Sequence, residues 1–175
     1  MWYCSRCVAG GSIEPAILGV DPGTAVSGVV RMRGDEIEFA AGEMENEKVF
    51  DCLAAADVLV IELFVLHGAV GSSCRDTILF TGRLWQAWKI LKGKEPVFLT
   101  RTKVTSRLGF ATKEARKDTR AMDTKVTELM RELYGDKPKK AGVTYHAWQA
   151  LGLLTAYNRI QDADRNKTSK KRIRS

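Results

Sequence analysis

Two short apolar runs, each ending in a carboxylate, are the clearest feature of the hydrophobic pattern. Residues 16–21 read Ala-Ile-Leu-Gly-Val-Asp, and residues 57–62 read Asp-Val-Leu-Val-Ile-Glu. Runs of this length that are apolar at nearly every position predict strands buried on both faces of a sheet. A Pro-Gly pair follows the first run and favours a sharp turn into a second apolar strand over 27–33. We therefore predict a hairpin followed, after an interval, by a central strand.

A third strand and a helix separate the two acidic strand ends. Residues 36–40 alternate between polar and apolar side chains, which predicts a strand with one face in water. This strand completes a three-stranded antiparallel meander. Apolar residues at helical spacing then predict a helix over 45–56. Because a right-handed crossover through that helix makes strand 57–62 parallel to the first strand, we expect Asp21 and Glu62 at the same edge of the sheet.

The second half of the chain adds one strand and three helices. Its apolar residues recur at helical spacing in three segments and form one short continuous run. The predicted elements are a helix over 74–92, a strand over 96–100, a helix that ends near 134 and a last helix over 145–160. Residues 141–158 contain no Lys, Arg, Asp or Glu, so the last helix should be mostly buried. Together the elements predict an α/β fold in which a five-stranded mixed sheet is flanked by helices.

The length and the two ends of the chain indicate one domain with two extensions. A chain of 175 residues can bury a substantial single core. Residues 1–15 lack a periodic pattern, and we expect an N-terminal extension before a domain of residues 16–160. Residues 161–175 are basic without apolar periodicity, which predicts a disordered tail. The sequence contains neither a run as long as a membrane span nor the pattern of a signal peptide, so we expect an intracellular protein with no membrane partner.

Charge is distributed unevenly along the chain. Residues 1–88 carry six Lys or Arg and twelve Asp or Glu, a net charge of −6. Residues 89–175 carry twenty-two basic and nine acidic residues, a net charge of +13. Such asymmetry predicts that the second half meets a polyanion, and nucleic acid is the usual one because each neutralised phosphate releases counterions.

Several motifs occur in an order that resembles a known group of nucleases. The first strand runs into Asp-Pro-Gly-Thr at 21–24, the strand over 57–62 ends in Val-Ile-Glu, and the next helix contains Gly82. A basic run follows the fifth strand, and the last helix opens with His-Ala-x-Gln-Ala-Leu at 146–151. This order resembles the ribonuclease H-like nuclease fold and, more narrowly, the RuvC-type Holliday-junction resolvases. The resemblance covers roughly residues 16–158.

The resemblance implies a metal-dependent enzyme. It implies two divalent ions, normally Mg²⁺ with Mn²⁺ as a substitute, held at the sheet edge and by the last helix. Hard cations prefer carboxylate oxygens, and two of them activate water and neutralise the charge that develops when a phosphodiester is cut. The metal-binding and catalytic positions implied here are Asp21, Glu62, His146 and Gln149. The resemblance also implies a location that contains DNA: a prokaryotic or viral cytoplasm, or an organelle.

Gln149 departs from the family pattern, which has Asp at this position. An amide oxygen can coordinate a metal ion but carries no negative charge. We therefore expect at least one ion to bind weakly and cleavage to be impaired. Asp118 and Asp123 lie in the basic region, and we do not expect them to compensate.

Basic residues after the fifth strand are expected to contact DNA phosphates, although each could also belong to a solvated basic face. In the family, an aromatic residue in the loop that follows the position of Glu62 probes the junction. The aligned position is Val65, and its neighbour Phe64 is our candidate. Lys103 and Lys117 are expected near the scissile phosphate, with Lys117 in the catalytic set. The predicted DNA-binding residues are Phe64, Arg101, Lys103, Arg107, Lys113, Arg116, Lys117 and Arg120.

These features predict a crossover junction endodeoxyribonuclease that binds four-way or branched DNA and resolves it by paired symmetric cuts. Paired cuts require a homodimer, for which Trp85 and Trp88 on the helix over 74–92 are the expected interface. One alternative is a related RNA-processing nuclease, YqgF-like, and another is a non-catalytic junction-binding protein, which Gln149 would explain. An actin-like or sugar-kinase-like ATPase also opens with Asp-x-Gly-Thr, but it needs two large lobes, for which 175 residues are too few.

Overall fold

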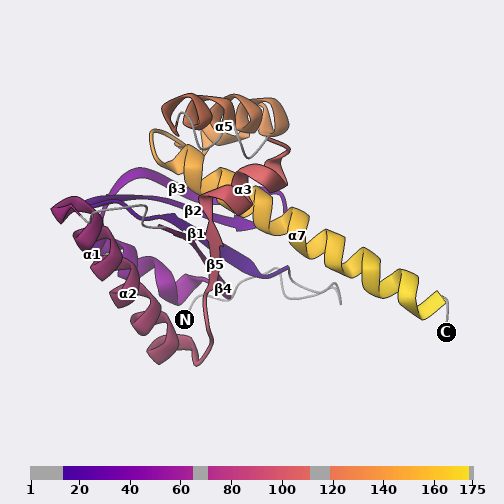
Figure 1. Ribbon diagram of the computed structural model, residues 1–175, viewed down its shortest axis with the longest axis horizontal. Helices are drawn as coiled ribbons and strands as arrows, with labels where there is room; N and C mark the ends of the chain where they lie inside the picture. The colour runs from indigo at the N-terminus through magenta and orange to yellow at the C-terminus, as the bar shows by residue number, and fades with distance from the viewer. Residues whose placement is uncertain (1–13, 65–70, 111–118, 174–175) are drawn as a thin grey trace, which may run out of the picture.

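A five-stranded mixed sheet forms the centre of the molecule (Figure 1). The computed structural model describes residues 14–64, 71–110 and 119–173. The strand order is β3-β2-β1-β4-β5, with β1 antiparallel to β2, β2 antiparallel to β3, and β4 parallel to both β1 and β5. The antiparallel meander and the parallel crossover are therefore confirmed. The strands are β1 (Ala16–Asp21), β2 (Val26–Arg33), β3 (Glu36–Glu45), β4 (Val58–Leu63) and β5 (Val97–Thr100).

Helices cover both faces of this sheet, and two of them were not predicted. Thr100 caps α3 by accepting a hydrogen bond from the backbone N–H of Lys103, and Gly109 ends that helix in the left-handed conformation. No described helix has both the length and the apolar character needed to cross a membrane. The helices are α1 (Asn46–Val49), the 3₁₀-helix η1 (Phe50–Ala55), α2 (Ser72–Lys92), α3 (Arg101–Leu108), α5 (Thr119–Tyr134), α6 (Lys137–Lys140) and α7 (Ala147–Ile173); α3 and α6 are the unpredicted ones.

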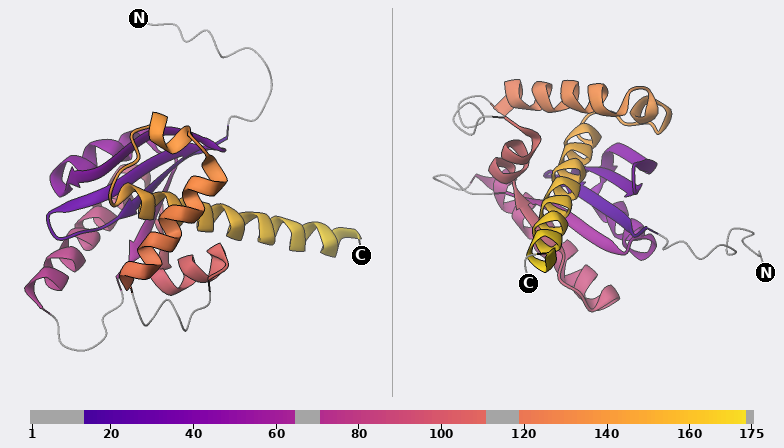
Figure 2. Two further views of the ribbon diagram at one scale, coloured as in Figure 1. Left: turned by 90° about the horizontal axis from the view of Figure 1, so that it is seen from above. Right: turned by 90° about the vertical axis from the view of Figure 1, so that its right-hand side faces the viewer.

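Alternate residues of the central strands build two separate cores. From β1, Leu18 and Val20 face α1, η1 and α2, where they pack with Leu84 and Trp88. On the other face Ile17 packs with α7, α3 and α5. Figure 1 shows α2 and α5 on opposite sides of the sheet, and Figure 2 shows α7 running across it. The sheet therefore brings the start of α7 against the strands that carry the acidic residues.

The register of β1 and β4 is fixed at both ends of the strands. At the start, the backbone N–H of Ala16 donates to Oδ2 of Asp57, and the N–H of Asp57 donates to the carbonyl of Ala16, both at 2.8 Å. At the far end Val20 lies opposite Ile61. The next residue of each strand is a carboxylate, so the two acids leave the sheet side by side.

The C-terminal segment differs from the prediction. Residues 161–173 continue α7 as a helix, whereas a disordered tail was expected after residue 160. The prediction was wrong because it used the missing apolar face as its criterion, and a solvated helix needs none. Ion pairs one turn apart, Asp162 with Arg165 and Asp164 with Lys167, favour the helix. This part of α7 projects from the body of the protein (Figure 1).

Candidate active site

Asp21 and Glu62 form a carboxylate pair at the carboxyl ends of β1 and β4. Their side chains are largely buried, with 14% and 10% of the side-chain surface exposed. Burial disfavours the charged form of a carboxyl group, and a second carboxylate nearby disfavours it further. Burial and then the charge of Asp21 raise the pKa of Glu62 to about 7, although Arg101 opposes this shift. The pair therefore forms a small region where negative charge is concentrated and poorly solvated.

A buried amide holds the turn that follows Asp21. The side chain of Asn46 donates to the carbonyl oxygens of Gly23 and Thr24, at 3.1 and 3.2 Å. Its Oδ1 accepts a hydrogen bond from Ser27 at 2.7 Å. Three bonds from one side chain leave the turn little freedom, which fixes the direction in which Asp21 leaves the strand. This role could not be predicted from the sequence, because Asn46 lies outside the motif that it supports.

Two glycines allow the segment before α7 to rest directly on the sheet. A Cβ on Gly28 of β2 would lie 2.2 Å from the carbonyl oxygen of His146, and a Cβ on Gly42 of β3 would lie 2.3 Å from that of Thr144. The β2–β3 register shifts at the same place, between Ser27 and Val29. Only glycine permits backbone segments to approach this closely. The glycines thus determine where His146 lies.

His146 meets the carboxylate pair from α7's side. Its Nδ1 lies 3.5 Å from Oδ2 of Asp21, and 57% of the imidazole surface is exposed. The hydrogen bond with Asp21 raises the pKa of His146 above its ordinary value, and the charge of Asp21 adds to the effect. The structure therefore brings His146 against Asp21, while Glu62 lies beside Asp21 at the end of the neighbouring strand.

Arg101, predicted as a DNA contact, lies inside the acidic cluster. Its Nη1 is 3.0 Å from Oε1 of Glu62, and its Nη2 pairs with Oδ1 of Asp123 on α5. One guanidinium group thus links an acid from the sheet to an acid from a helix. Asp123 was not expected at the site, because its neighbours in the sequence are basic. No local sequence signal could have shown that α5 would turn it toward Glu62.

Gln149 lies in the first turn of α7 beside the same cluster. Its Nε2 donates to the backbone carbonyl of Asp123 at 3.2 Å. In this arrangement the amide holds α7 against α5 rather than bonding to either sheet acid. A carboxylate at position 149 could not make this bond, because it has no donor.

The side chains at this sheet edge meet only some of the requirements of a divalent ion. Asp21, Glu62 and His146 offer two carboxylates and an imidazole, which are suitable ligands. Burial, and then the charge of Asp21, raise the pKa of Glu62, and a nearby cation would favour its ionised form. Among the described residues, however, no three His, Cys, Asp or Glu side chains are grouped closely enough to enclose an ion. The residue types thus suit a divalent ion, but the described residues form no complete three-ligand site, and α7 adds only the uncharged amide of Gln149.

The remaining predicted residues lie around this centre or outside the described chain. Phe64 directly follows β4 and is 46% exposed. Lys103 and Arg107 are exposed on α3, and Arg120 is exposed at the start of α5. Outside the described residues lie Val65, Lys113, Arg116, Lys117 and Asp118.

Comparison with known proteins supports the fold that this geometry suggests. No protein-family model matches the chain, and no curated protein sequence matches it. Among solved structures, the chain is similar to T. thermophilus RuvC in complex with a Holliday junction substrate, with a TM-score of 0.62 and 12% identity. It is also similar to a second Thermus thermophilus RuvC structure, with a TM-score of 0.57 and 13% identity. Each match covers 85% of this chain and 96% of the other. The chain therefore has the ribonuclease H-like fold in its RuvC-type form.

Proposed function

We propose that this protein is a divalent-metal-dependent endonuclease that binds four-way or other branched DNA. The observation that carries the proposal is the buried Asp21–Glu62 pair at the ends of parallel strands, with His146 against Asp21. A RuvC-type fold with such a pair, in a chain whose second half is strongly basic, favours phosphodiester cleavage in DNA. Resolution of a four-way junction would then require two symmetric cuts.

The residues of the site have distinct roles in this proposal. Asp21, Glu62 and His146 would hold Mg²⁺, or Mn²⁺ in its place, and the bound metal supplies neutralisation of the charge that develops on the cleaved phosphate. Asn46 and the Gly28 contact keep these side chains aligned. Lys103, Arg107 and Arg120 would contact neighbouring phosphates, as would Lys113, Arg116 and Lys117. Phe64 would meet the bases at the branch point.

Arg101 and Gln149 limit the activity we expect. Arg101 already pairs with Glu62 and Asp123, so a metal ion would compete with an internal cation. Gln149 supplies no charge from α7. These two observations favour slow cleavage, and they also favour the second candidate function, a junction-binding protein without nuclease activity.

The test is a labelled four-way junction incubated with the protein in Mg²⁺ and in Mn²⁺, beside a duplex of the same sequence. Junction binding tighter than duplex binding supports the proposal, and its absence contradicts it. Gln149→Asp should raise the rate of symmetric nicking by on the order of a hundredfold, because a carboxylate on α7 would help to hold the divalent ion that neutralises the reacting phosphate. Gln149→Ala should stay slow, and Gln161→Asp, further along the same helix, is the matched control. Junction binding without nicking in every variant would favour the non-catalytic candidate, and preference for branched RNA would favour an RNA-processing nuclease.

A homodimer remains part of the proposal, with α2 as the interface. The prediction for Trp88 needs correction, because this side chain is only 1% exposed and belongs to the monomer core. Trp85 is 41% exposed and donates to Glu95. The apolar surface that α2 offers to a partner is instead richest at Leu79 and Ile90, which are 59% and 79% exposed. A monomeric mass in light scattering would contradict this interface.

A further inference from the structure

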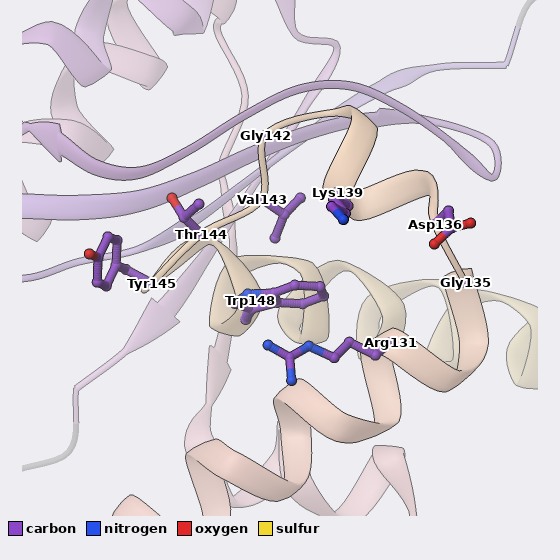
Figure 3. A pocket seen from close by; sticks show the side chains of 9 residues that line it. All are labelled: Arg131, Gly135, Asp136, Lys139, Gly142, Val143, Thr144, Tyr145 and Trp148. Atoms are coloured by element: carbon purple, nitrogen blue, oxygen red, sulfur yellow. The ribbon is translucent and has the colours of Figure 1, made fainter.

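A hollow on the far side of His146 has features that the proposed cleavage site does not use. It has a volume of about 720 Å³ and lies between the end of α5, the short helix α6 and the start of α7. Figure 3 shows the indole of Trp148 in the middle of this hollow, with Arg131 on one side and the segment over 142–145 on the other. A volume of this size is typical of sites for small organic ligands. The hollow therefore has room for a group as large as a nucleotide.

The side chains in this hollow combine an aromatic surface with positive charge. The guanidinium carbon of Arg131 lies 5.3 Å from the centre of the Trp148 ring, within cation–π distance. Lys139 also lines the hollow, and Asp136 is the one acid among its lining residues. Lys137 and Lys140 are exposed on the same short helix. A flat aromatic group attached to an anion would match this set, since the ring can stack and the anion can meet the cations.

The hollow adjoins a second one that is lined by two of the proposed site residues. A second hollow of about 510 Å³ is lined by His146 and Gln149, and the two share Arg131, Tyr145 and Trp148. Since His146 lies against Asp21 and lines the second hollow, a strand bound at the carboxylate pair would have a path past His146 toward Trp148. A nucleic-acid strand that follows this path would bring its next base to the indole.

Tyr145 marks the boundary between the two hollows. It is 71% exposed and has a φ of 39°, and it is the single non-glycine residue with positive φ in the described ranges. This conformation is unfavourable for a residue with a side chain. The close packing of Thr144 on Gly42 and of His146 on Gly28 holds the segment in place. The result is an aromatic side chain held outward at the rim.

We propose that the Trp148 hollow receives one unpaired nucleotide of the bound DNA, with its base stacked on the indole and its phosphate at Arg131 and Lys139. This inference rests on the proposed function and adds a feature of the substrate: a nucleotide freed from pairing near the branch point. Stacking on an aromatic side chain tolerates any base. The hollow would thus recognise an unpaired nucleotide whatever its base, and not a particular DNA sequence.

The test compares two labelled four-way junctions, one fully paired and one with a single unpaired 2-aminopurine at the branch. The wild-type protein should bind the second junction about tenfold more tightly and quench its fluorescence, because stacking on an aromatic side chain is worth about 1–3 kcal/mol per base. Trp148→Leu should abolish the preference and the quenching, and Trp148→Phe should retain most of both. Tyr157→Leu is the control, because this aromatic residue lies further along α7, lines neither hollow and should leave the ratio unchanged.

The outcomes separate this inference from the proposed function. Preferential binding of both junctions over duplex, with no effect of Trp148→Leu on their ratio, would overturn the nucleotide site and leave the proposed function standing. Failure to bind either junction would overturn both. Thermal unfolding of Trp148→Leu and Trp148→Phe provides the check on folding, and an intact Trp148→Phe protein without the preference would also overturn the inference.

Discussion

The two halves of the candidate site are built in different ways. The sheet contributes Asp21 and Glu62, which are buried, negatively charged and held by strand register. The α7 side contributes His146 and Gln149, which carry no negative charge and are held by hydrogen bonds and by glycine contacts. The negative charge that would bind a metal is therefore concentrated on the sheet. We infer from this difference that the residues on the sheet should determine the affinity for a cation. The residues on the α7 side should mainly affect the rate of cleavage once the cation is bound.

Removing charge from the sheet side should have the largest effect. Asp21→Asn should weaken Mn²⁺ binding, measured by calorimetry or by electron paramagnetic resonance, by at least about a hundredfold, because charge interactions in a partly buried site are several-fold stronger than in water. Glu47→Gln removes a carboxylate that pairs with Arg83 at the surface and is the matched control. Equal Mn²⁺ affinity in wild type and Asp21→Asn would show that the ion binds elsewhere.

The raised pKa of Glu62 should make the metal-free protein less stable as pH rises. The folded protein holds this proton up to about pH 7, whereas the unfolded chain releases it near the ordinary value of 4.5. The folded state therefore binds more protons between these values, and the free energy of unfolding falls as pH increases through this window. The Glu62→Gln variant lacks this dependence on pH. Between about pH 4.5 and pH 7, its free energy of unfolding should therefore rise relative to that of the wild type by on the order of 3 kcal/mol.

Urea unfolding in the presence of a chelator, at several pH values below and above 7, measures this difference. Added Mn²⁺ should reduce the difference at high pH, because the cation offsets the repulsion in the wild type. A difference that is constant with pH would mean that Glu62 titrates normally.

Disturbing the contact between Gly28 and the backbone of His146 should have a smaller effect on the site. Gly28→Ala should destabilise the protein by about 1–3 kcal/mol, because the new methyl group overlaps the backbone of His146. It should also return the pKa of His146 toward its ordinary value by separating the imidazole from Asp21. The chain contains only two histidines, so an NMR titration can follow this change. Gly82→Ala, which meets open space on α2, should instead stabilise the helix by up to about 1 kcal/mol.

Removing Arg101 should change Mn²⁺ binding by the smallest amount. Arg101→Gln takes away the cation that links Glu62 to Asp123, so Mn²⁺ should bind up to about tenfold more tightly at a pH well above 7. Arg107→Gln, on the exposed side of the same helix, is the control. Weaker Mn²⁺ binding in Arg101→Gln would show that the guanidinium group is needed to position the acids.

The sheet was predictable because its pattern depends on local burial. Runs of apolar residues ending in Asp21 and Glu62 identified β1 and β4, and their common edge followed from the handedness of the crossover. The position of His146 near Asp21 followed from the resemblance. The roles of Arg101, Asp123 and Asn46 could not be predicted, because each depends on contacts between segments far apart in the chain. The helix α3 was missed because its short basic sequence has little apolar periodicity.

The length of α7 has a consequence for how its outer part is ordered. The helix has 27 residues and extends about 40 Å, but only its first part is buried. Helix formation is limited by the first turn, and each further residue adds at little cost once that turn exists. The packed residues near Ala150 and Leu154 therefore act as a permanent nucleus, from which the exposed turns propagate. Hydrogen exchange should rise steadily toward Ile173, and a partner that grips the outer turns would lengthen the protected helix without having to nucleate it.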